Sequence, residues 1–287
     1  MLKGDDKMGY SIFEGTMADM NWLEIEKAAE QGAIILFPMG VIEEHGPHLC
    51  LGTDIYMSYC NCRQIADKLN ASGTLTLLAP PFYWGINNVT GAFPGSFTVK
   101  KETMKAMISD LLDNLHRWGF EDIFCFCGHE DPEHILTILD AVRTCRKTNS
   151  LRARVVMEDY VAGRFGFNGQ EEELLLLSPV FPEPEQSGAI EDHEPDFDVH
   201  AGSIETACMN LYFPGLVNRE VAKGLTSTSL KADEIDCWTK GGETTREMTP
   251  MGYAGNPANF INEAGVEQFM DYLADYSAGC IAESLKR

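Results

Sequence analysis

The sequence of 287 residues has few basic groups for its size. Lys and Arg together number 22 against 44 Asp and Glu, so the formal net charge is −22. This charge repels the phosphate backbone of nucleic acids and offers anionic lipid surfaces nothing to attract, so we expect no nucleic-acid partner. An acidic surface also suits a cation binder, but on composition alone a solubilising surface is the simpler explanation.

Long apolar runs and paired cysteines are missing as well. No stretch approaches the roughly 20 apolar residues of a membrane span, and residues 1–20 contain no uninterrupted apolar segment typical of a signal peptide. The nine Cys form no CxxC pair and no zinc-ribbon spacing, so we expect reduced thiols. Together these absences predict a cytoplasmic protein without a membrane partner.

Apolar runs alternate with helical patterns along the chain. Strands are predicted from short apolar runs at 33–37, 74–79, 123–127 and 154–157. Helices are predicted from apolar residues at three- and four-residue spacing over 54–69, 102–118, 133–147 and 263–287. Strands that alternate with helices favour an α/β fold, in which a mainly parallel sheet is covered on both faces. The length fits one domain over residues 1–287.

One segment interrupts this alternation. Residues 165–218 contain no Lys or Arg, many acidic residues and the proline-rich piece SPVFPEPEQSG. Because this stretch lacks a strand or helix period, we expect an acidic, irregular lid or excursion at about residues 165–200 rather than a second domain.

A polar cluster directly follows the first predicted strand. Residues 40–54 read GVIEEHGPHLCLGTD, and Glu43, His45 and Asp54 offer ligands for a divalent cation of the Zn, Mn or Fe type. Each residue alone has a simpler explanation. Asp54 suits a helix N-terminus, His45 a satisfied core position and Glu43 a hydrated surface.

A second cluster, GHEDPEH, directly follows the third predicted strand. Because the carboxyl ends of parallel strands meet at one edge of the sheet, His129 and Asp131 should approach the first cluster. Five ligands with three carboxylates exceed the needs of one tetrahedral ion. They suit two ions roughly 3.5–4 Å apart, bridged by a carboxylate and a water. We therefore predict a two-ion site that activates water.

Two further groups of residues have open roles. In VHAGSIETACMN, which begins at Val199, His200 could deliver a proton or hold a substrate, or the stretch could simply cap a helix. Tyr83, Trp84 and Phe93 follow the second predicted strand. They are candidate pocket walls, with ordinary core packing as the equal alternative.

These stretches resemble the creatininase (creatinine amidohydrolase) family. Residues 38–54, PMGVIEEHGPHLCLGTD, are similar to the family's P-x-G-x-x-E-x-H-G-P-H-L-P-L-x-T-D. Four shorter segments follow in the family's order: FPGSFTV, FCGHEDP, VHAGSIETA and MGYAGNPA. The resemblance implies a three-layer α/β/α sandwich, a metal-dependent amidohydrolase and a homo-oligomer, mostly a hexamer in this family.

The resemblance also implies a ligand set for two divalent ions, Zn or Mn with Fe as a third option. The first ion would be held by Glu43, Asp54 and His129. The second ion would be held by His45, Asp54 and Asp131. Asp131 stands where creatinine-cleaving members have Glu, and Glu130 is its rival. The catalytic residues implied are His200 and Glu205.

The expected activity is attack by an activated water on a small molecule, either an amide with a non-peptide C–N bond or a cyclic carbonyl compound. Alternatives are a formamide deformylase, a hydrolase of cyclic inosose-type ketones and a non-catalytic metal-binding relative; the family also includes a peptidase of cofactor maturation. The chain departs from the family pattern at Cys127 and Cys50. It also has no Trp between Trp118 and Trp238 to match the family's lid tryptophans.

Overall fold

A parallel sheet forms the middle layer of the protein. The computed structural model describes residues 10–180, 198–260 and 263–286. In the described residues the sheet has the strand order β2-β1-β3-β4-β5, and every neighbouring pair is parallel. The strands are β1 Ile34–Met39, β2 Thr76–Leu78, β3 Asp122–Cys127, β4 Arg152–Glu158 and β5 Leu174–Leu177.

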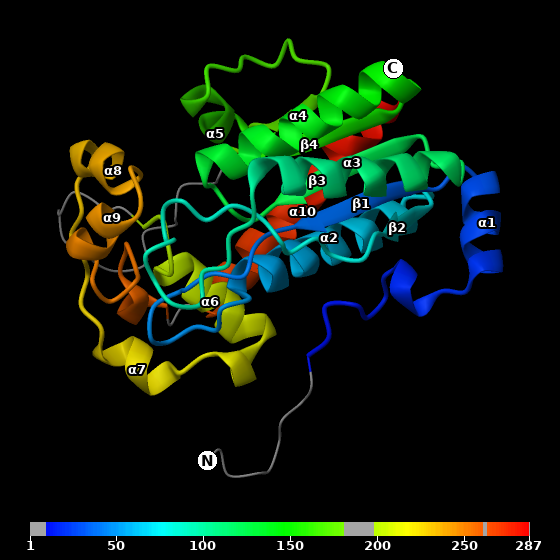
Figure 1. Cartoon of the computed structure of the whole chain (residues 1–287). Helices are drawn as coiled ribbons and strands as arrows, with labels where there is room; N and C mark the ends of the chain where they lie inside the picture. The colour runs from blue at the N-terminus through cyan, green and yellow to red at the C-terminus, as the bar shows by residue number, and fades with distance from the viewer. Residues whose placement is uncertain (1–9, 181–197, 261–262, 287) are drawn as a thin grey trace.

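Helices cover both faces of the sheet, as Figure 1 shows. One face carries α3 Lys101–Arg117 and α4 Pro132–Asn149, and the other carries α2 Thr53–Ala71 and α10 Glu263–Leu285. Alternate residues of β1 point to opposite faces, so Ile35 packs with α3 and α4 while Leu36 packs with α2. This arrangement confirms the predicted three-layer α/β/α sandwich.

The predicted strands and helices are all present, with ends shifted by a few residues, but β5 was not predicted. It falls inside the stretch 165–200, which we expected to be irregular, so that stretch is not irregular throughout its described part. Four consecutive Leu residues give no alternation, which explains why the strand has no clear period. The rest of the expected lid, residues 181–197, lies outside the described residues.

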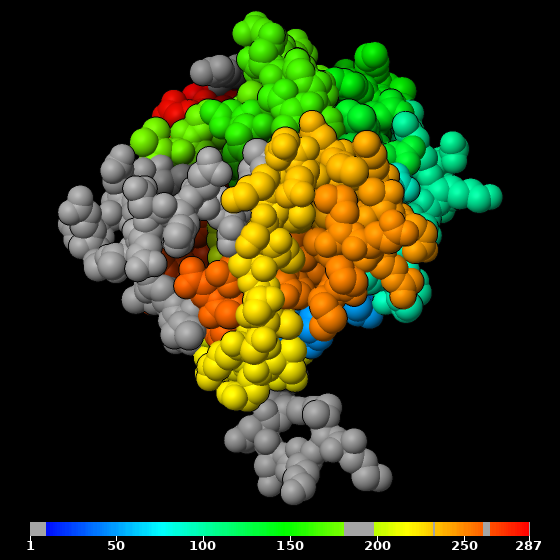
Figure 2. All heavy atoms as spheres, turned by 90° about the vertical axis from the view of Figure 1, so that its left-hand side faces the viewer, coloured from blue at the N-terminus to red at the C-terminus, as the bar shows by residue number. Residues whose placement is uncertain are grey.

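Smaller helices gather at the carboxyl ends of the strands. They are α6 Ser203–Tyr212, α7 Arg219–Gly224, α8 Ala232–Trp238 and α9 Glu243–Met248. Figure 2 looks onto this end, where α7 to α9 (yellow and orange) spread over the surface. Helix α1, Trp22–Glu30, lies near the amino-terminal ends of the strands. Helix α5, Asp159–Arg164, directly follows β4. In the described residues, no helix combines the length and the apolarity needed to cross a membrane.

The register of the two central strands brings the two polar loops together. Met39 is the last residue of β1, Cys127 is the last residue of β3, and the two are register partners. Both loops therefore begin side by side at one edge of the sheet. Gly128 donates its N–H to the Met39 carbonyl at 3.0 Å, which keeps the loops in contact one residue further.

Candidate metal centre

The centre is built where the loop after β1, the loop after β3 and the first turn of α2 meet. Asp54 is the second residue of α2 and is 2% exposed. A Cβ on Gly128 would lie 2.5 Å from the Ser58 hydroxyl and 2.9 Å from the Asp54 carbonyl oxygen. Only glycine therefore lets the β3 loop approach α2 closely enough to place His129 beside Asp54.

Asp54 lies between two imidazoles. Its Oδ1 is 3.0 Å from His45 Nε2, and its Oδ2 is 3.3 Å from His129 Nδ1. His129 Nδ1 is also 2.9 Å from Glu43 Oε1. All four side chains are buried. One carboxylate that faces two imidazoles through different oxygens is the arrangement expected of a ligand shared by two ions.

Each imidazole in the cluster has one nitrogen on a backbone carbonyl. His45 Nδ1 lies 3.2 Å from the Glu43 oxygen, His129 Nε2 lies 3.0 Å from the Ile86 oxygen, and His200 Nε2 lies 2.9 Å from the Glu44 oxygen. Because a carbonyl only accepts, these outer nitrogens carry the protons. The inner nitrogens therefore point at the carboxylates with a free lone pair whenever the ring is neutral, which is the tautomer that metal-binding histidines need.

The charges in the cluster depend on one another. Burial alone would lower the pKa of His45 and His129, but Asp54 next to His45 and Glu43 next to His129 raise both well above the usual value. Burial would raise the pKa of Glu43 and Asp54, but the imidazoles hold both below the usual value. Without an ion, protons on the imidazoles compensate the carboxylates. A divalent cation would take over that role and release the protons.

Buried polar atoms without a hydrogen-bond partner also indicate that the donor set fits divalent cations. His45 Nε2 and Asp54 Oδ2 are buried and make no hydrogen bond of acceptable geometry. Among the described residues, three groups of donors lie close enough together to hold an ion, with every donor pair within 4.8 Å. They are Glu43–Asp54–His129, His45–Asp54–Glu205 and Glu43–His45–His200. Imidazole nitrogens mixed with carboxylate oxygens suit Zn, Mn and Fe.

Not every predicted ligand joins these groups. Asp131 is buried, but it is the N-cap of α4, and both of its carboxylate oxygens accept backbone N–H groups. Its rival Glu130 is half exposed and pairs with Arg164 at 2.8 Å. The structure therefore brings Glu43, His45, Asp54 and His129 together and places both acidic residues of the β3 loop in other contacts.

The predicted catalytic residues His200 and Glu205 both lie next to His45. The rings of His45 and His200 have centroids 4.4 Å apart, and Glu205 Oε2 is 3.8 Å from His45 Nε2. Burial, which is the largest effect, raises the pKa of Glu205. Glu205 lies in the first turn of α6, which begins at Ser203.

The five motifs of the sequence all reach this centre. Ser96 of FPGSFTV accepts the Glu44 N–H at 3.1 Å. In MGYAGNPA, Ala254 pairs with His200 through an antiparallel bridge, which fixes the backbone of His200. A Cβ on Gly252 would lie 1.9 Å from Glu44 Oε2, so this glycine leaves room for that carboxylate.

Sequence reasoning missed Trp238. Its indole lies 6.0 Å from the His200 imidazole, centroid to centroid, and it is buried. The chain thus has an aromatic neighbour for the centre although no Trp occurs between Trp118 and Trp238. No motif surrounds Trp238, and only the packing of α8 and α9 over the carboxyl edge reveals it (Figure 2).

The candidate pocket walls Tyr83, Trp84 and Phe93 contact residues other than the candidate ligands. Trp84 is 38% exposed and packs against Tyr83 and Phe97, with ring centroids 5.2 and 5.7 Å away. Arg246 lies over the Phe93 ring. Cys127, where the chain departs from the family pattern, donates its thiol proton to the His129 carbonyl at 3.1 Å. Burial raises the pKa of this thiol to about 12, so it stays a protonated donor.

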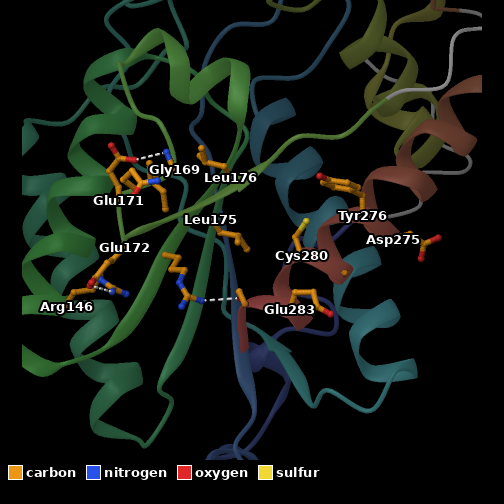
Figure 3. Close-up of a pocket in the computed structure, with 15 residues that line it drawn as sticks. Arg146, Gly169, Glu171, Glu172, Leu175, Leu176, Asp275, Tyr276, Cys280 and Glu283 are labelled. Atoms are coloured by element: carbon orange, nitrogen blue, oxygen red, sulfur yellow. Dashed lines mark hydrogen bonds and ion pairs between the residues drawn. The ribbon is translucent and has the colours of Figure 1, made fainter. Parts of the chain in front are cut away.

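A separate hollow lies between β5 and α10. Figure 3 shows this pocket of about 740 Å³. Its lining includes Arg146 and Glu172, which form an ion pair at 3.1 Å, together with Leu175, Tyr276 and Cys280. None of the predicted site residues lines it. This hollow therefore lies apart from the candidate metal centre.

A buried set of imidazoles and carboxylates at the carboxyl edge of a parallel sheet makes this an α/β protein with a candidate centre for divalent cations. The sequence profile of the creatininase family, described as creatinine amidohydrolase, matches residues 18–280. The chain therefore belongs to the creatininase family, whose members are metal-dependent amidohydrolases.

Two curated relatives differ in what they act on. The creatinine amidohydrolase of Pseudomonas putida is 25% identical over 219 residues, which cover 74% of this chain and 75% of the relative. The mycofactocin precursor peptide peptidase of Mycolicibacterium smegmatis is 22% identical over 256 residues, which cover 88% and 85%.

Solved structures show the same fold. A creatininase described as the Mn form superposes with a TM-score of 0.67 at 18% identity, covering 94% of this chain and 98% of that one. A mutant creatininase of Zn-Zn type gives a TM-score of 0.69 at 18% identity, covering 96% and 99%.

Proposed function

We propose that this protein uses two divalent ions, Zn or Mn, to hydrolyse a non-peptide C–N amide bond or a cyclic carbonyl group in a small molecule. The single observation that carries the proposal is the position of Asp54, with one oxygen toward His45 and the other toward His129. Support also comes from the relatives, since solved creatininases are described as Mn or Zn-Zn forms.

The ligands would divide between two ions around Asp54. Glu43 and His129 would hold the first ion with Asp54, and His45 would hold the second with Asp54. Ions at these positions would supply an activated water and polarise the carbonyl oxygen of the substrate. Thr90 donates its hydroxyl to Glu43 Oε2, which orients the Glu43 carboxylate without placing a second charge beside it.

His200 is the proposed proton carrier. Its Nε2–H is held by the Glu44 carbonyl at 2.9 Å, and Glu44 Oε1 lies 3.2 Å from the same nitrogen. Its Nδ1 is 3.9 Å from Glu43 Oε1, so this nitrogen faces the reacting side of the cluster. A ring oriented in this way can pass a proton to a leaving nitrogen.

The buried position of the cluster favours a small substrate. Glu43, His45 and Asp54 are at most 2% exposed, and His200 is 7% exposed. A peptide substrate, as named for the mycobacterial relative, is the second candidate, because that relative covers most of the chain.

Activity assays on metal-free and reloaded protein test the proposal. The chelated protein should be inactive, Mn²⁺ or Zn²⁺ should restore turnover, and His129→Ala and Asp54→Ala should abolish it while circular dichroism shows a folded chain. Glu130→Gln is the matched control, because Glu130 adjoins His129 but pairs with Arg164. A folded wild type that binds neither metal would exclude the proposal.

A substrate panel separates the alternatives. It should contain cyclic amides, formamides, cyclic inosose-type ketones and a short peptide, each offered to the metal-loaded protein. A chain that binds metal but turns over none of them would favour the non-catalytic alternative. Sedimentation of the same preparation checks the homo-oligomer, which stays a prediction together with the cytoplasmic location.

A further inference from the structure

The Asp131 carboxylate is fully used by backbone N–H groups. Its Oδ1 accepts from Glu133 and His134 at 3.0 and 3.3 Å, which caps α4. Its Oδ2 accepts from Asn88 and Val89 at 2.7 and 3.1 Å. A carboxylate offers about four lone-pair positions, and these four bonds fill them in a side chain that is only 3% exposed.

The loop that Asp131 holds, residues 86–90, touches two ligands of the first ion. The carbonyl of Ile86 receives the His129 Nε2 proton, and the hydroxyl of Thr90 donates to Glu43. The Ile86 N–H donates in turn to His134 Nδ1 at 3.2 Å, and His134 lies in the first turn of α4. The N-terminus of α4 therefore fixes the partners that orient His129 and Glu43.

The same loop is held from its other side by the turn between α8 and α9. Gly242 donates its N–H to the Asn88 carbonyl at 2.9 Å and to the Val89 carbonyl at 3.2 Å. A Cβ on Gly241 would lie 2.3 Å from the Asn88 oxygen, and its φ is +83°, so glycine is required at this contact. Freeing Asp131 to reach an ion would break two amide contacts of a loop that is held on both sides.

Glu205 occupies the position that a third ligand of the second ion needs. Its Oε2 is 3.8 Å from His45 Nε2, and its donor atom lies within 4.8 Å of those of both His45 and Asp54. The Ala201 N–H binds the same oxygen, which aims the carboxylate toward His45. The side chain is 21% exposed, so it borders the solvent side of the cluster.

We propose that Glu205 completes the second ion site and that Asp131 is a positioning residue, which acts on the first ion through residues 86–90. This assignment rests on the proposed two-ion function and changes the ligand set that the resemblance implied. It predicts that the two acidic residues affect different ions. Loss of Glu205 removes a ligand of the second ion, whereas loss of Asp131 loosens the orientation of His129 and Glu43 at the first.

Calorimetric titration of the chelated full chain with Zn²⁺, checked by elemental analysis, tests the assignment. The wild type should bind about two equivalents, Glu205→Gln about one, and Asp131→Asn about two. In Asp131→Asn one of the two binding steps should weaken about tenfold to hundredfold, the usual effect of losing a partner behind a ligand. Asp131→Ser, which keeps a helix cap, should behave in the same way if Asp131→Asn folds poorly.

The outcomes distinguish failure of this ligand assignment from failure of the proposed two-ion function. About one equivalent in Asp131→Asn with about two in Glu205→Gln would overturn the assignment and restore Asp131 as the ligand. Equal stoichiometry in the two variants would overturn it as well. A folded wild type that takes up no Zn²⁺ or Mn²⁺ would instead remove the proposed function. Co²⁺ absorption bands, recorded on both variants, add a readout of ligand geometry that does not depend on turnover.

Discussion

The indole of Trp238 lies against the imidazole of His200, with ring centroids 6.0 Å apart and the planes tilted by 42°. The indole is fixed by its own hydrogen bond, because Nε1–H donates to the Thr249 hydroxyl at 2.9 Å. A rigid aromatic ring, contributed by a helix at the carboxyl edge, therefore limits where the proposed proton carrier can turn.

Replacing Trp238 should lower turnover without removing metal. In Trp238→Ala the imidazole of His200 gains freedom, and we expect kcat to fall about tenfold to hundredfold, because small misplacements of a reacting group are costly. Trp238→Phe should retain most of the activity. Steady-state kinetics and metal content check this, with the half-exposed Trp118→Ala as control. Loss of metal in Trp238→Ala would mean that the indole supports the ligands instead.

Gly128→Ala should destabilise the protein and weaken metal binding. The added methyl group would lie 2.5 Å from the Ser58 hydroxyl, and the cost of such overpacking is about 1–3 kcal/mol. Gly163→Ala is the matched control, because no atom lies within 4 Å of its added Cβ and it lies in α5. Thermal unfolding and Zn²⁺ titration of both variants check the prediction. Equal behaviour of the two would contradict the close approach of the β3 loop to α2.

His134→Phe should weaken metal binding although His134 is not a ligand. The substitution removes the acceptor of the Ile86 N–H, and Ile86 in turn orients His129. Losing such a partner typically costs about tenfold to hundredfold in metal affinity. Competition with a chromophoric chelator measures it. Leu136→Ala, on the exposed side of the same helix, should leave the affinity unchanged.

The metal-free protein should lose stability in acid partly through His48. Burial, followed by the charge of His45, lowers the pKa of His48 to about 4. The Thr206 hydroxyl donates to the Gly202 carbonyl and accepts the His48 Nε2–H at 2.9 Å, which fixes the tautomer of the neutral ring, while burial disfavours its charged form. The unfolded chain protonates this residue near pH 6.5, so its contribution is complete above that pH. It is lost progressively as the pH falls toward about 4.

A comparison with His48→Gln isolates this effect from other acid-sensitive groups. Both proteins should be unfolded with urea in a chelator between pH 7.5 and 4.5. Between pH 7.5 and 4.5, the free energy of unfolding of the wild type should fall by about 1–3 kcal/mol more than that of the variant. Parallel pH profiles would show that His48 is accessible to protons in the folded state.

Sequence reasoning placed the first loop correctly for a physical reason. The candidate ligands Glu43, His45 and Asp54 lie within twelve positions of one another along the chain, directly after an apolar strand, so topology alone puts them at the sheet edge. His129 joins them because its strand pairs in register with the same strand. Local spacing and the parallel-sheet rule together are sufficient to predict that these four residues lie at the same edge of the sheet.

The direction of an individual side chain is harder to predict. Asp131 has the residue type and the position of a ligand, but its carboxylate turns to a loop some forty residues earlier, at Asn88 and Val89. Which acceptor those amides find depends on tertiary packing, and no spacing rule contains that information. The same limit applies to Trp238, which reaches the centre only through the fold of α8 and α9.

The in-register pairing of Met39 with Cys127 links the centre to the assembly of the sheet. A β1–β3 pairing displaced by one residue would move one loop by about 3.3 Å and turn its side chains to the opposite face. Glu43 and His129 would then no longer lie in contact. Under the proposed metal function, binding free energy would stabilise only the chain whose β1 and β3 pair in the correct register. Metal would therefore favour this register over a displaced one during folding.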